Sequence, residues 1–186
     1  ALYATLLEGP GHSADPAGVV LFPGVIDALH ELTRRGYLRI IVTNHSGIGQ
    51  GFFTEADFAA VQAELHRQLL VHGITIDAVY HCPHRREDSC DCRKPGTAMH
   101  RQATERFGID LARSWCVGDR PGDLLPARTL GAQAILVLTG DGALHADDAR
   151  SLGVPVAADL RAAGAPQTAP RGDTRGAPST PTRPST

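Results

Sequence analysis

The residues best suited to metal chemistry lie in one short segment, which reads Cys82-Pro83-His84, then five residues, then Cys90-Asp91-Cys92. In a reducing compartment, cysteines clustered in this way indicate a metal site more than a disulfide. Three thiolates and one imidazole are a standard tetrahedral donor set for zinc. Since no ligand position is left open, we predict a structural zinc ion held by Cys82, His84, Cys90 and Cys92, which closes a loop with little apolar content. Incidental surface cysteines are the alternative, and His81 is expected to be a bystander.

Lysine and asparagine are almost absent from the sequence. Of the 18 basic residues, every one except Lys94 is arginine, and Asn44 is the single asparagine. Such a bias is typical of a G+C-rich genome, in which codons for both residues are scarce. Because a compact ammonium and a planar guanidinium are not interchangeable, the retained lysine indicates a position that requires an ammonium. Chance survival of one codon is the alternative.

Polar residues follow the apolar run at 37–42, which is predicted to be a buried strand. Thr43 and Asn44 end this run, and the small residues at 46–49 continue as a loop suited to an anion. A strand also ends in Thr-Asn for reasons of turn formation, so the motif is weak by itself. We expect the Thr43 hydroxyl and the backbone amides that follow it to face the edge of the sheet.

Charged residues follow two other predicted elements. Arg93-Lys94-Pro95 comes directly after the last cysteine, so a zinc-closed loop would hold two cations at a defined place. The segment from Gly118-Asp119 to Asp123 puts two carboxylates at a strand end, where Mg²⁺ commonly lies beside a phosphate. Each motif has a simpler explanation as a capped turn or a helix N-terminus. Their combination, which contains both the single Asn and the single Lys, favours a phosphate-handling site.

Hydrophobic periodicity predicts an alternation of strands and helices. Strands are expected at 2–7, 37–42, 77–81, 115–117, 134–138 and 154–156, with loop-like sequence at 12–22. Helices are expected at 25–32, 54–69 and 97–107, followed by a short one that ends at residue 130. This order implies an α/β fold with a parallel sheet and right-handed crossovers. Ligands bind such sheets beyond the carboxyl ends of the strands.

Length and composition set the outer limits of the prediction. The 186 residues suffice for one domain with a proper core. A net charge of −2 excludes a global field that would attract nucleic acid or an anionic membrane. No apolar run approaches the roughly 18 residues of a membrane span, and the first basic residue is Arg34, so we expect no signal peptide and a cytoplasmic protein, monomeric by default. From residue 164 on, Pro, Thr, Arg, Gly and Ser dominate, which predicts a domain over 1–163 and a disordered tail over 164–186.

At the level of whole motifs, the sequence resembles the D-glycero-D-manno-heptose-1,7-bisphosphate phosphatases, a branch of the haloacid dehalogenase superfamily shared with the histidinol-phosphate phosphatases. The resemblance extends over about residues 21–140, and the metal loop is its most specific part. It is carried by Thr43-Asn44-His45-Ser46-Gly47-Ile48, Cys82-Pro83-His84, Cys90-Asp91-Cys92-Arg93-Lys94-Pro95 and Val117-Gly118-Asp119. It implies a Rossmann-like three-layer sandwich with a central parallel sheet and a zinc-bound loop. It also implies bound Mg²⁺ and hydrolysis of a sugar phosphate through a phospho-aspartate.

The resemblance assigns roles by position. Thr43 and Lys94 would steady the phosphoryl group, and Asp119 would hold Mg²⁺ with Asp123 nearby. The substrate contacts that it implies are made by Asn44, His45, Ser46, Arg93 and Lys94. His45 stands where the family usually has Gln. Heptose bisphosphate is favoured over histidinol phosphate as substrate only by closeness of motif.

The first strand departs from the family, which carries Asp-x-Asp-Gly-Thr at this strand's end. Aligning Gly9 with the family glycine places Leu6 at the nucleophile position, Glu8 at the acid/base position and Pro10 at the Thr position. A leucine cannot attack phosphorus or ligate Mg²⁺, because nucleophilic catalysis needs an activated heteroatom. Glu8 could still ligate metal or relay a proton. Its longer side chain would displace the carboxylate by about 1 Å, enough to cost on the order of 10²-fold in rate.

Three explanations of this departure are open. The chain is a degenerate phosphatase that keeps the fold, the zinc and the anion pocket; or its beginning is truncated or altered, since it starts at Ala1 without Met; or a residual route activates water through Glu8 and metal. The functions that follow are a sugar-phosphate phosphatase, a non-catalytic sugar-phosphate-binding or regulatory protein, and a structural zinc-binding scaffold. Phosphate release from a panel of substrates separates the first from the others.

Overall fold

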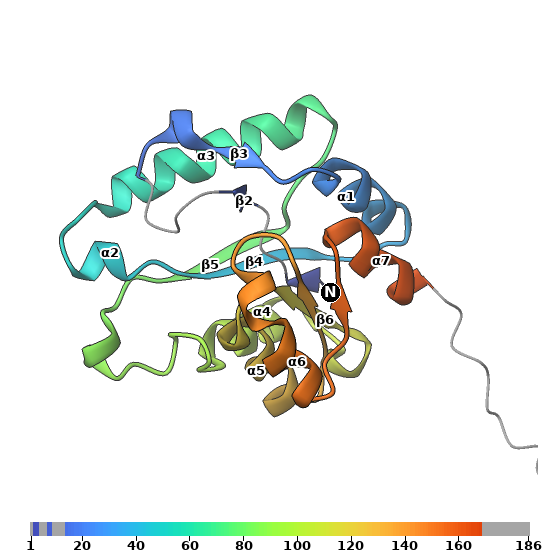
Figure 1. Cartoon of the computed structure of the whole chain (residues 1–186). Helices are drawn as coiled ribbons and strands as arrows, with labels where there is room; N and C mark the ends of the chain where they lie inside the picture. Colours follow the sequence, from blue (N-terminus) through green and yellow to red (C-terminus); the bar gives the residue numbers. More distant parts are fainter. Residues whose placement is uncertain (1, 4–6, 9–13, 169–186) are drawn as a thin grey trace, which may run out of the picture.

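The computed structural model describes the backbone of residues 2–3, 7–8 and 14–168 and the side chains of residues 14–164. A six-stranded sheet forms its centre, in the order β5-β4-β1-β6-β7-β8, and every neighbouring pair is parallel (Figure 1). Its strands are β1 (Leu2–Tyr3), β4 (Arg39–Asn44), β5 (Ala78–Cys82), β6 (Trp115–Gly118), β7 (Gln133–Val137) and β8 (Val156–Ala157). The predicted parallel sheet is confirmed.

Helices cover both faces of this sheet. One face carries α1 (Val25–Arg34), α3 (Glu55–Val71) and α7 (Leu160–Thr168), and the other carries α4 (Ala98–Phe107), α5 (Pro121–Leu130) and α6 (Gly142–Ser151) (Figure 1). The molecule is therefore the three-layer α/β sandwich that the resemblance implied. Within the described residues, none of the helices has the length and apolar composition needed to cross a membrane.

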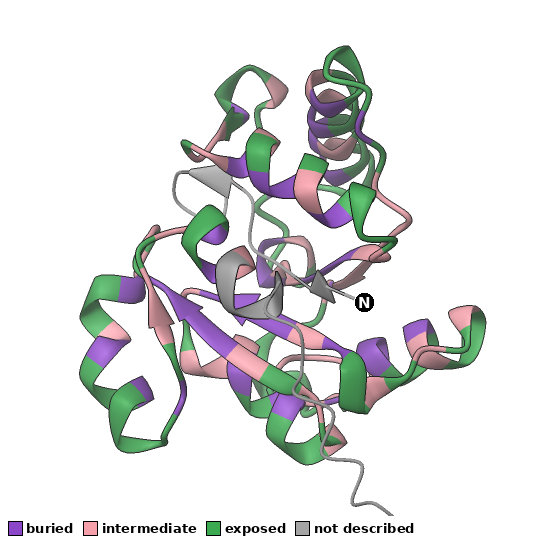
Figure 2. Ribbon diagram, turned by 90° about the vertical axis from the view of Figure 1, so that its right-hand side faces the viewer, coloured by how far each residue is buried: buried purple, intermediate pink, exposed green. Residues whose placement is uncertain are grey.

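Alternation along the strands builds a separate core on each face. Ile41 and Val117 point to the layer of α1 and α3, whereas Ile40, Val42 and Cys116 point to the layer of α4 and α5. Such continuous apolar runs are expected of strands that are buried on both faces. Figure 2 shows buried residues along the central strands and exposed residues on the outer turns of the helices.

The long helix α3 begins where the sequence indicated. The Thr54 hydroxyl accepts a hydrogen bond from the Asp57 amide at 3.2 Å, and the Asp57 carboxylate accepts one from the Thr54 amide at 2.8 Å. This reciprocal capping box satisfies amides that the first helical turn leaves without partners. The apolar residues of α3 recur at helical spacing and are buried against the sheet; they are Phe58, Val61, Leu65 and Leu69.

The first strand predicted at 2–7 is two strands in the structure. β1 ends at Tyr3, and β2 (Leu7–Glu8) pairs antiparallel with β3 (Val20–Leu21), in a segment predicted to be a loop. Residues 4–6 lie outside the described residues. The prediction failed because strands of two residues carry too short an apolar pattern to be recognised.

Three α-helices in the described part of the chain were not predicted. The segment 46–49, expected to be an anion-binding loop, is a single helical turn, α2 (Ser46–Gly49). α6 buries only small groups such as Ala146 and Ala149, so its apolar periodicity is weak. α7 continues through Gly164 to Thr168, so the expected boundary at residue 164 falls inside a helix. Residues 169–186 lie outside the described part of the chain, and a disordered tail there stays a prediction.

Candidate functional site

The carboxyl ends of the parallel strands bring the predicted site residues to one edge of the sheet. β4 ends at Asn44, β5 at Cys82 and β6 at Gly118, and the register pairs Asn44 with Cys82. β1 lies between β4 and β6. This edge is where open parallel sheets bind ligands.

The predicted metal ligands form a compact cluster in the loop after β5. One ligand atom from each of Cys82, His84, Cys90 and Cys92 lies within 4.8 Å of all the others. The Sγ–Sγ distances are 3.2–3.5 Å, and His84 Nδ1 lies 3.2 Å from Cys92 Sγ. Around a tetrahedral zinc with bonds of about 2.3 Å to sulfur, the sulfur atoms would lie roughly 3.8 Å from one another. The three thiols would therefore move apart only slightly to bind zinc. The cluster could hold one metal ion.

His81 and Cys116 stand outside this cluster. His81 Nε2 lies 2.8 Å from a Glu55 carboxylate oxygen at the start of α3. Burial raises the pKa of the Cys116 thiol to about 12, so this fourth cysteine stays protonated in the core. The prediction that His81 is a bystander agrees with this placement.

The metal loop packs directly against the end of β4 and α2. The His45 amide donates to the Cys82 carbonyl at 2.8 Å, and the Gly49 amide donates to the Pro83 carbonyl at 2.9 Å. A Cβ at position 49 would lie 2.7 Å from that carbonyl oxygen, so the close approach requires a glycine. The small residues at 46–49 therefore serve the packing of this turn in the structure.

Lys94 is the residue at which three parts of the chain meet. Its ammonium donates to the Val42 carbonyl at 2.5 Å and forms an ion pair with Asp123 at 2.6 Å. Its backbone is held by the Asn44 side chain, which donates to the Lys94 carbonyl at 3.1 Å and accepts from the Lys94 amide at 3.0 Å. The single asparagine of the sequence thus fixes the single lysine. The Lys94 side chain is only 10% exposed, which leaves little room for a wider cation.

Asp123 approaches this lysine because α5 starts very close to β6. A Cβ at Gly118 would overlap the Asp123 side chain, so glycine is required there. Asp123 Oδ1 pairs with Lys94, and its Oδ2 accepts from the Arg120 amide at 3.2 Å. Both carboxylate oxygens are therefore engaged by protein groups, and the predicted Mg²⁺ contact of Asp123 stays a prediction.

Asp119 follows β6 directly and points toward the turn after β7. Its Oδ2 accepts a hydrogen bond from the Asp141 amide at 3.0 Å. Mg²⁺ is commonly bound by one or two carboxylates together with water and substrate phosphate. The Asp119 carboxylate, held in place at the binding edge of the sheet, is suited to be one of these ligands.

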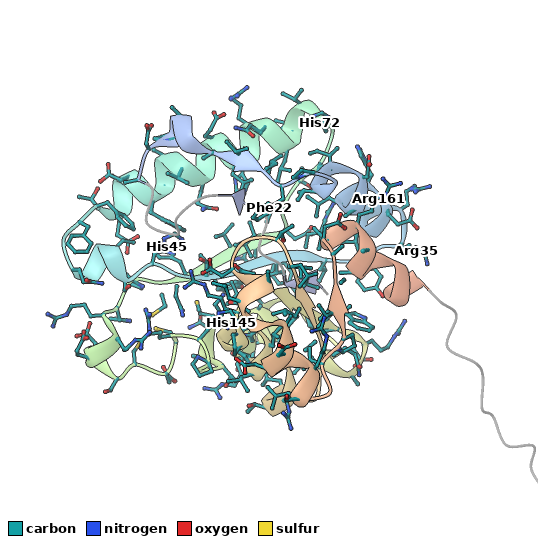
Figure 3. The ribbon with its side chains drawn as sticks, in the orientation of Figure 1. Phe22, Arg35, His45, His72, His145 and Arg161 are labelled. Atoms are coloured by element: carbon teal, nitrogen blue, oxygen red, sulfur yellow. The ribbon has the colours of Figure 1, made fainter. Side chains whose placement is uncertain are left out.

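The remaining predicted site residues lie on the neighbouring segments. Figure 3 labels His45 beyond the end of β4, on the same side of the molecule as the sulfur atoms. The His45 ring packs on Phe58, with 4.7 Å between centroids, and Ser46 is buried at the start of α2. The Arg93 guanidinium donates to the His84 carbonyl at 3.4 Å. Thr43 lies near the end of β4, opposite His81 of β5.

The residues of the altered first strand are described only in part. The Glu8 backbone pairs with Val20 in the small antiparallel sheet, while its side chain lies outside the described residues. Leu6 and Pro10 also lie outside them. Their assignment to the nucleophile, acid/base and Thr positions stays a prediction.

Sequence reasoning missed a buried histidine under the site. His100 of α4 is 1% exposed, and burial lowers its pKa to about 4, an effect to which the charge of Lys94 adds. The imidazole is therefore neutral at neutral pH. His100 belongs to α4, which follows the metal loop and was predicted over 97–107. A single histidine in a helical pattern gives no sign in the sequence that it is buried.

The turn after β7 was also missed. Asp141 supplies the amide that holds Asp119, and the Arg120 guanidinium forms an ion pair with the Asp141 carboxylate. The segment Thr139-Gly140-Asp141-Gly142 follows a predicted strand and has turn-forming composition. Because all parallel strands end at the same edge, its position after a strand was the available signal.

Comparisons with known proteins give a consistent result. A family model described as HAD-hydrolase-like matches residues 91–163. The D-glycero-β-D-manno-heptose-1,7-bisphosphate 7-phosphatase of Pseudomonas aeruginosa is 39% identical over 134 residues, which cover 72% of each chain. A probable D-glycero-D-manno-heptose-1,7-bisphosphate 7-phosphatase of Thermoplasma volcanium is 42% identical over 106 residues, which cover 57% of this chain and 73% of the relative.

A solved structure is similar over nearly the whole fold. The D,D-heptose 1,7-bisphosphate phosphatase of Bordetella bronchiseptica, complexed with magnesium and phosphate, superimposes with a TM-score of 0.82 at 30% identity. The match covers 89% of this chain and 95% of the other.

Proposed function

The chain belongs to the family of the D-glycero-β-D-manno-heptose-1,7-bisphosphate 7-phosphatases, within the haloacid dehalogenase-like hydrolases, and from this premise we propose that it is a phosphatase acting on a sugar phosphate. The substrate we propose is a heptose 1,7-bisphosphate. In the reaction, the phosphorus–oxygen bond of a phosphomonoester breaks and an oxygen atom from water is added to phosphorus. The sugar oxygen takes up a proton and leaves as a hydroxyl group, and inorganic phosphate is the second product.

The observation that carries the proposal is the environment of Lys94. A nearly buried ammonium, anchored by Val42 and Asp123, lies at the binding edge of a parallel sheet. An ammonium there can stabilise negative charge that develops on a phosphoryl group. The Thr43 hydroxyl, near the end of the same strand as Asn44, would donate a hydrogen bond to the phosphate. Arg93, His45 and Ser46 would contact the rest of the substrate, and Asn44 would contribute by holding Lys94.

Magnesium, when bound, would supply positive charge beside the phosphoryl group. Asp119 would hold it, and the anchored carboxylate of this residue supports that role. Asp123 would act nearby by balancing the charge of Lys94. Zinc would occupy the cluster of Cys82, His84, Cys90 and Cys92, where it would keep the chain leading to Lys94 in place. A metal-binding thiol cluster of this kind is consistent with a cytoplasmic location, which we include in the proposal.

The nucleophile decides how fast the reaction can run. With Leu6 at the aligned position, a covalent route has no attacking atom, so we expect slow turnover that depends on water activated near Glu8. The second candidate function is a non-catalytic sugar-phosphate-binding protein, which the leucine favours. Both candidates require the phosphate site, and they differ only in turnover.

Phosphate release separates the two candidates. The purified protein is incubated with Mg²⁺ and a panel of sugar bisphosphates that includes the heptose 1,7-bisphosphate, with histidinol phosphate as the competing substrate. Release from the heptose bisphosphate supports the proposal, and preference for histidinol phosphate moves the chain to the neighbouring branch. Binding without release from any substrate rejects the enzyme and supports the binding protein.

A further inference from the structure

The turn between β7 and α6 is built around the carboxylate of Asp119. The Asp141 amide donates to Asp119 Oδ2 at 3.0 Å, and in the described part of the chain this is the one hydrogen bond of that carboxylate. The two residues are far apart in sequence, on the loops after neighbouring strands β6 and β7. The contact therefore belongs to the tertiary fold and not to a local cap.

Gly140 makes this contact possible. Its φ of +63° lies in the left-handed region, and a Cβ at this position would overlap Asp119 Oδ2. Gly142 is restricted by packing alone, because its Cβ would overlap the Val137 carbonyl. With glycine at both positions, the turn can press its backbone against the end of β7 and against Asp119.

An ion pair closes the same turn from outside. The Arg120 guanidinium contacts the Asp141 carboxylate, and the Arg120 amide donates to Asp123. The turn is thereby linked to the start of α5, which holds the partner of Lys94. Both charged side chains of the pair are well exposed, so the pair itself contributes little. The position of the turn against Asp119 therefore depends on the Asp141 amide and on Gly140.

We propose that Asp141, through its backbone amide, and Gly140, through its missing side chain, are positioning residues that orient Asp119 for metal binding. The inference rests on the proposed function, in which Asp119 holds Mg²⁺. Groups that orient a metal ligand typically change metal affinity by 10–100-fold when they are lost. The Gly140→Ala substitution should push the Asp119 carboxylate out of its orientation and weaken divalent metal binding by about that factor.

The chain offers a matched control in Gly108. Its φ is +60°, nearly that of Gly140, but no atom lies within 4 Å of a Cβ built there. Gly108→Ala therefore imposes a backbone penalty of the same kind, at a similar φ, without touching Asp119. The test measures binding of Mn²⁺, used as a spectroscopic substitute for Mg²⁺, by electron paramagnetic resonance of the free ion. The expected result is weaker binding in Gly140→Ala and affinity within about twofold of wild type in Gly108→Ala.

Two further variants make the outcome decisive. Asp119→Asn should weaken Mn²⁺ binding, and adding Gly140→Ala to it should have no further effect, because both act through one carboxylate. Loss of affinity in Asp119→Asn but not in Gly140→Ala overturns the positioning role only. Unchanged affinity in Asp119→Asn overturns both this role and the proposed magnesium site.

Thermal unfolding tests the contact without any metal. Gly140→Ala should lower the Tm more than Gly108→Ala does, and the excess should disappear when Asp119→Ala removes the overlapping carboxylate. If Gly140→Ala does not fold, the double variant should restore folding. Equal losses in the two glycine variants, or an excess that persists without the Asp119 carboxylate, would refute the proposed contact.

Discussion

At the residue scale, Lys94 is the central group of the site. Composition predicted that this lysine matters, since it is retained against a strong bias toward arginine. The structure gives the physical setting: an ammonium between the Val42 carbonyl and the Asp123 carboxylate, with a side chain that is 10% exposed. A guanidinium is planar and larger, so it cannot make the same two contacts in the same space.

We expect Lys94→Arg to weaken the binding of inorganic phosphate by about tenfold or more, although the charge is kept. Isothermal titration with phosphate in the presence of Mg²⁺ measures this. Arg128→Lys, an exchange of the same two residue types at an exposed position of α5, is the control and should leave the affinity unchanged. Equal affinity in Lys94→Arg and wild type would show that charge suffices.

A second prediction concerns His100, whose folded-state pKa of about 4 lies below its ordinary value of 6.5. Between these values the unfolded chain binds more protons than the folded one, so stability is full above pH 6.5 and falls as the pH drops toward 4. The loss from pH 7 to pH 5 is about 2 kcal/mol. Urea unfolding at the two pH values measures it, and His100→Gln should lose less by that amount. Parallel losses in the two proteins would remove His100 as the cause.

At this scale, the sequence predicted which residues belong to the site, but it could not predict which of them contact one another. Asn44 and Lys94 were both assigned to the site, but their mutual hydrogen bonds join residues 50 positions apart. Such contacts depend on how the metal loop returns to β4, which no local pattern encodes. Asp141 was missed because it contacts Asp119 across the fold, and because the group that makes the contact is a backbone amide, which every residue except proline carries.

At the scale of elements, the metal loop is the part that local sequence predicted best. Its four donors lie within eleven residues of one another, so their spacing constrains their geometry directly. Weakly patterned elements were lost instead. α6 buries alanines, and β3 has two residues, so neither carries a clear apolar period.

If zinc occupies the cluster as proposed, we expect Cys92→Ser to abolish its binding and to lower stability by at least about 3 kcal/mol, a fraction of the roughly 10–16 kcal/mol with which structural zinc binds. For a chain of this size, the Tm would fall by roughly 6–12 °C. Elemental analysis and thermal unfolding measure the two effects. Cys116→Ser is the control for metal content and should keep one zinc per chain. Purified wild type without zinc, or unchanged stability after chelation, would rule out the structural role.

At the scale of the whole molecule, the fold was predictable because the longer strands of the sheet and the helices α1 and α3 carry the pattern that their layers require. Strands apolar on both faces need helices on both sides, and the order of elements then leaves a parallel sheet as the solution. The same topology gathers Asn44, Cys82 and Asp119 at one edge without any need for sequence proximity. The fold thus places the Lys94 ammonium and the carboxylates of Asp119 and Asp123 at this edge, whatever the net charge of −2.

We propose that this edge of the sheet is a working phosphatase site whose rate is limited by Leu6 and Glu8 of the first strand. Phosphate release from heptose 1,7-bisphosphate with Mg²⁺, compared between wild type and the Leu6→Asp/Glu8→Asp double variant, tests it most directly. We predict slow release by wild type and release faster by about 10²-fold or more in the double variant, since a positioned nucleophile and acid/base are restored. If the double variant folds and binds metal but releases no phosphate, the downstream residues do not form a phosphatase site.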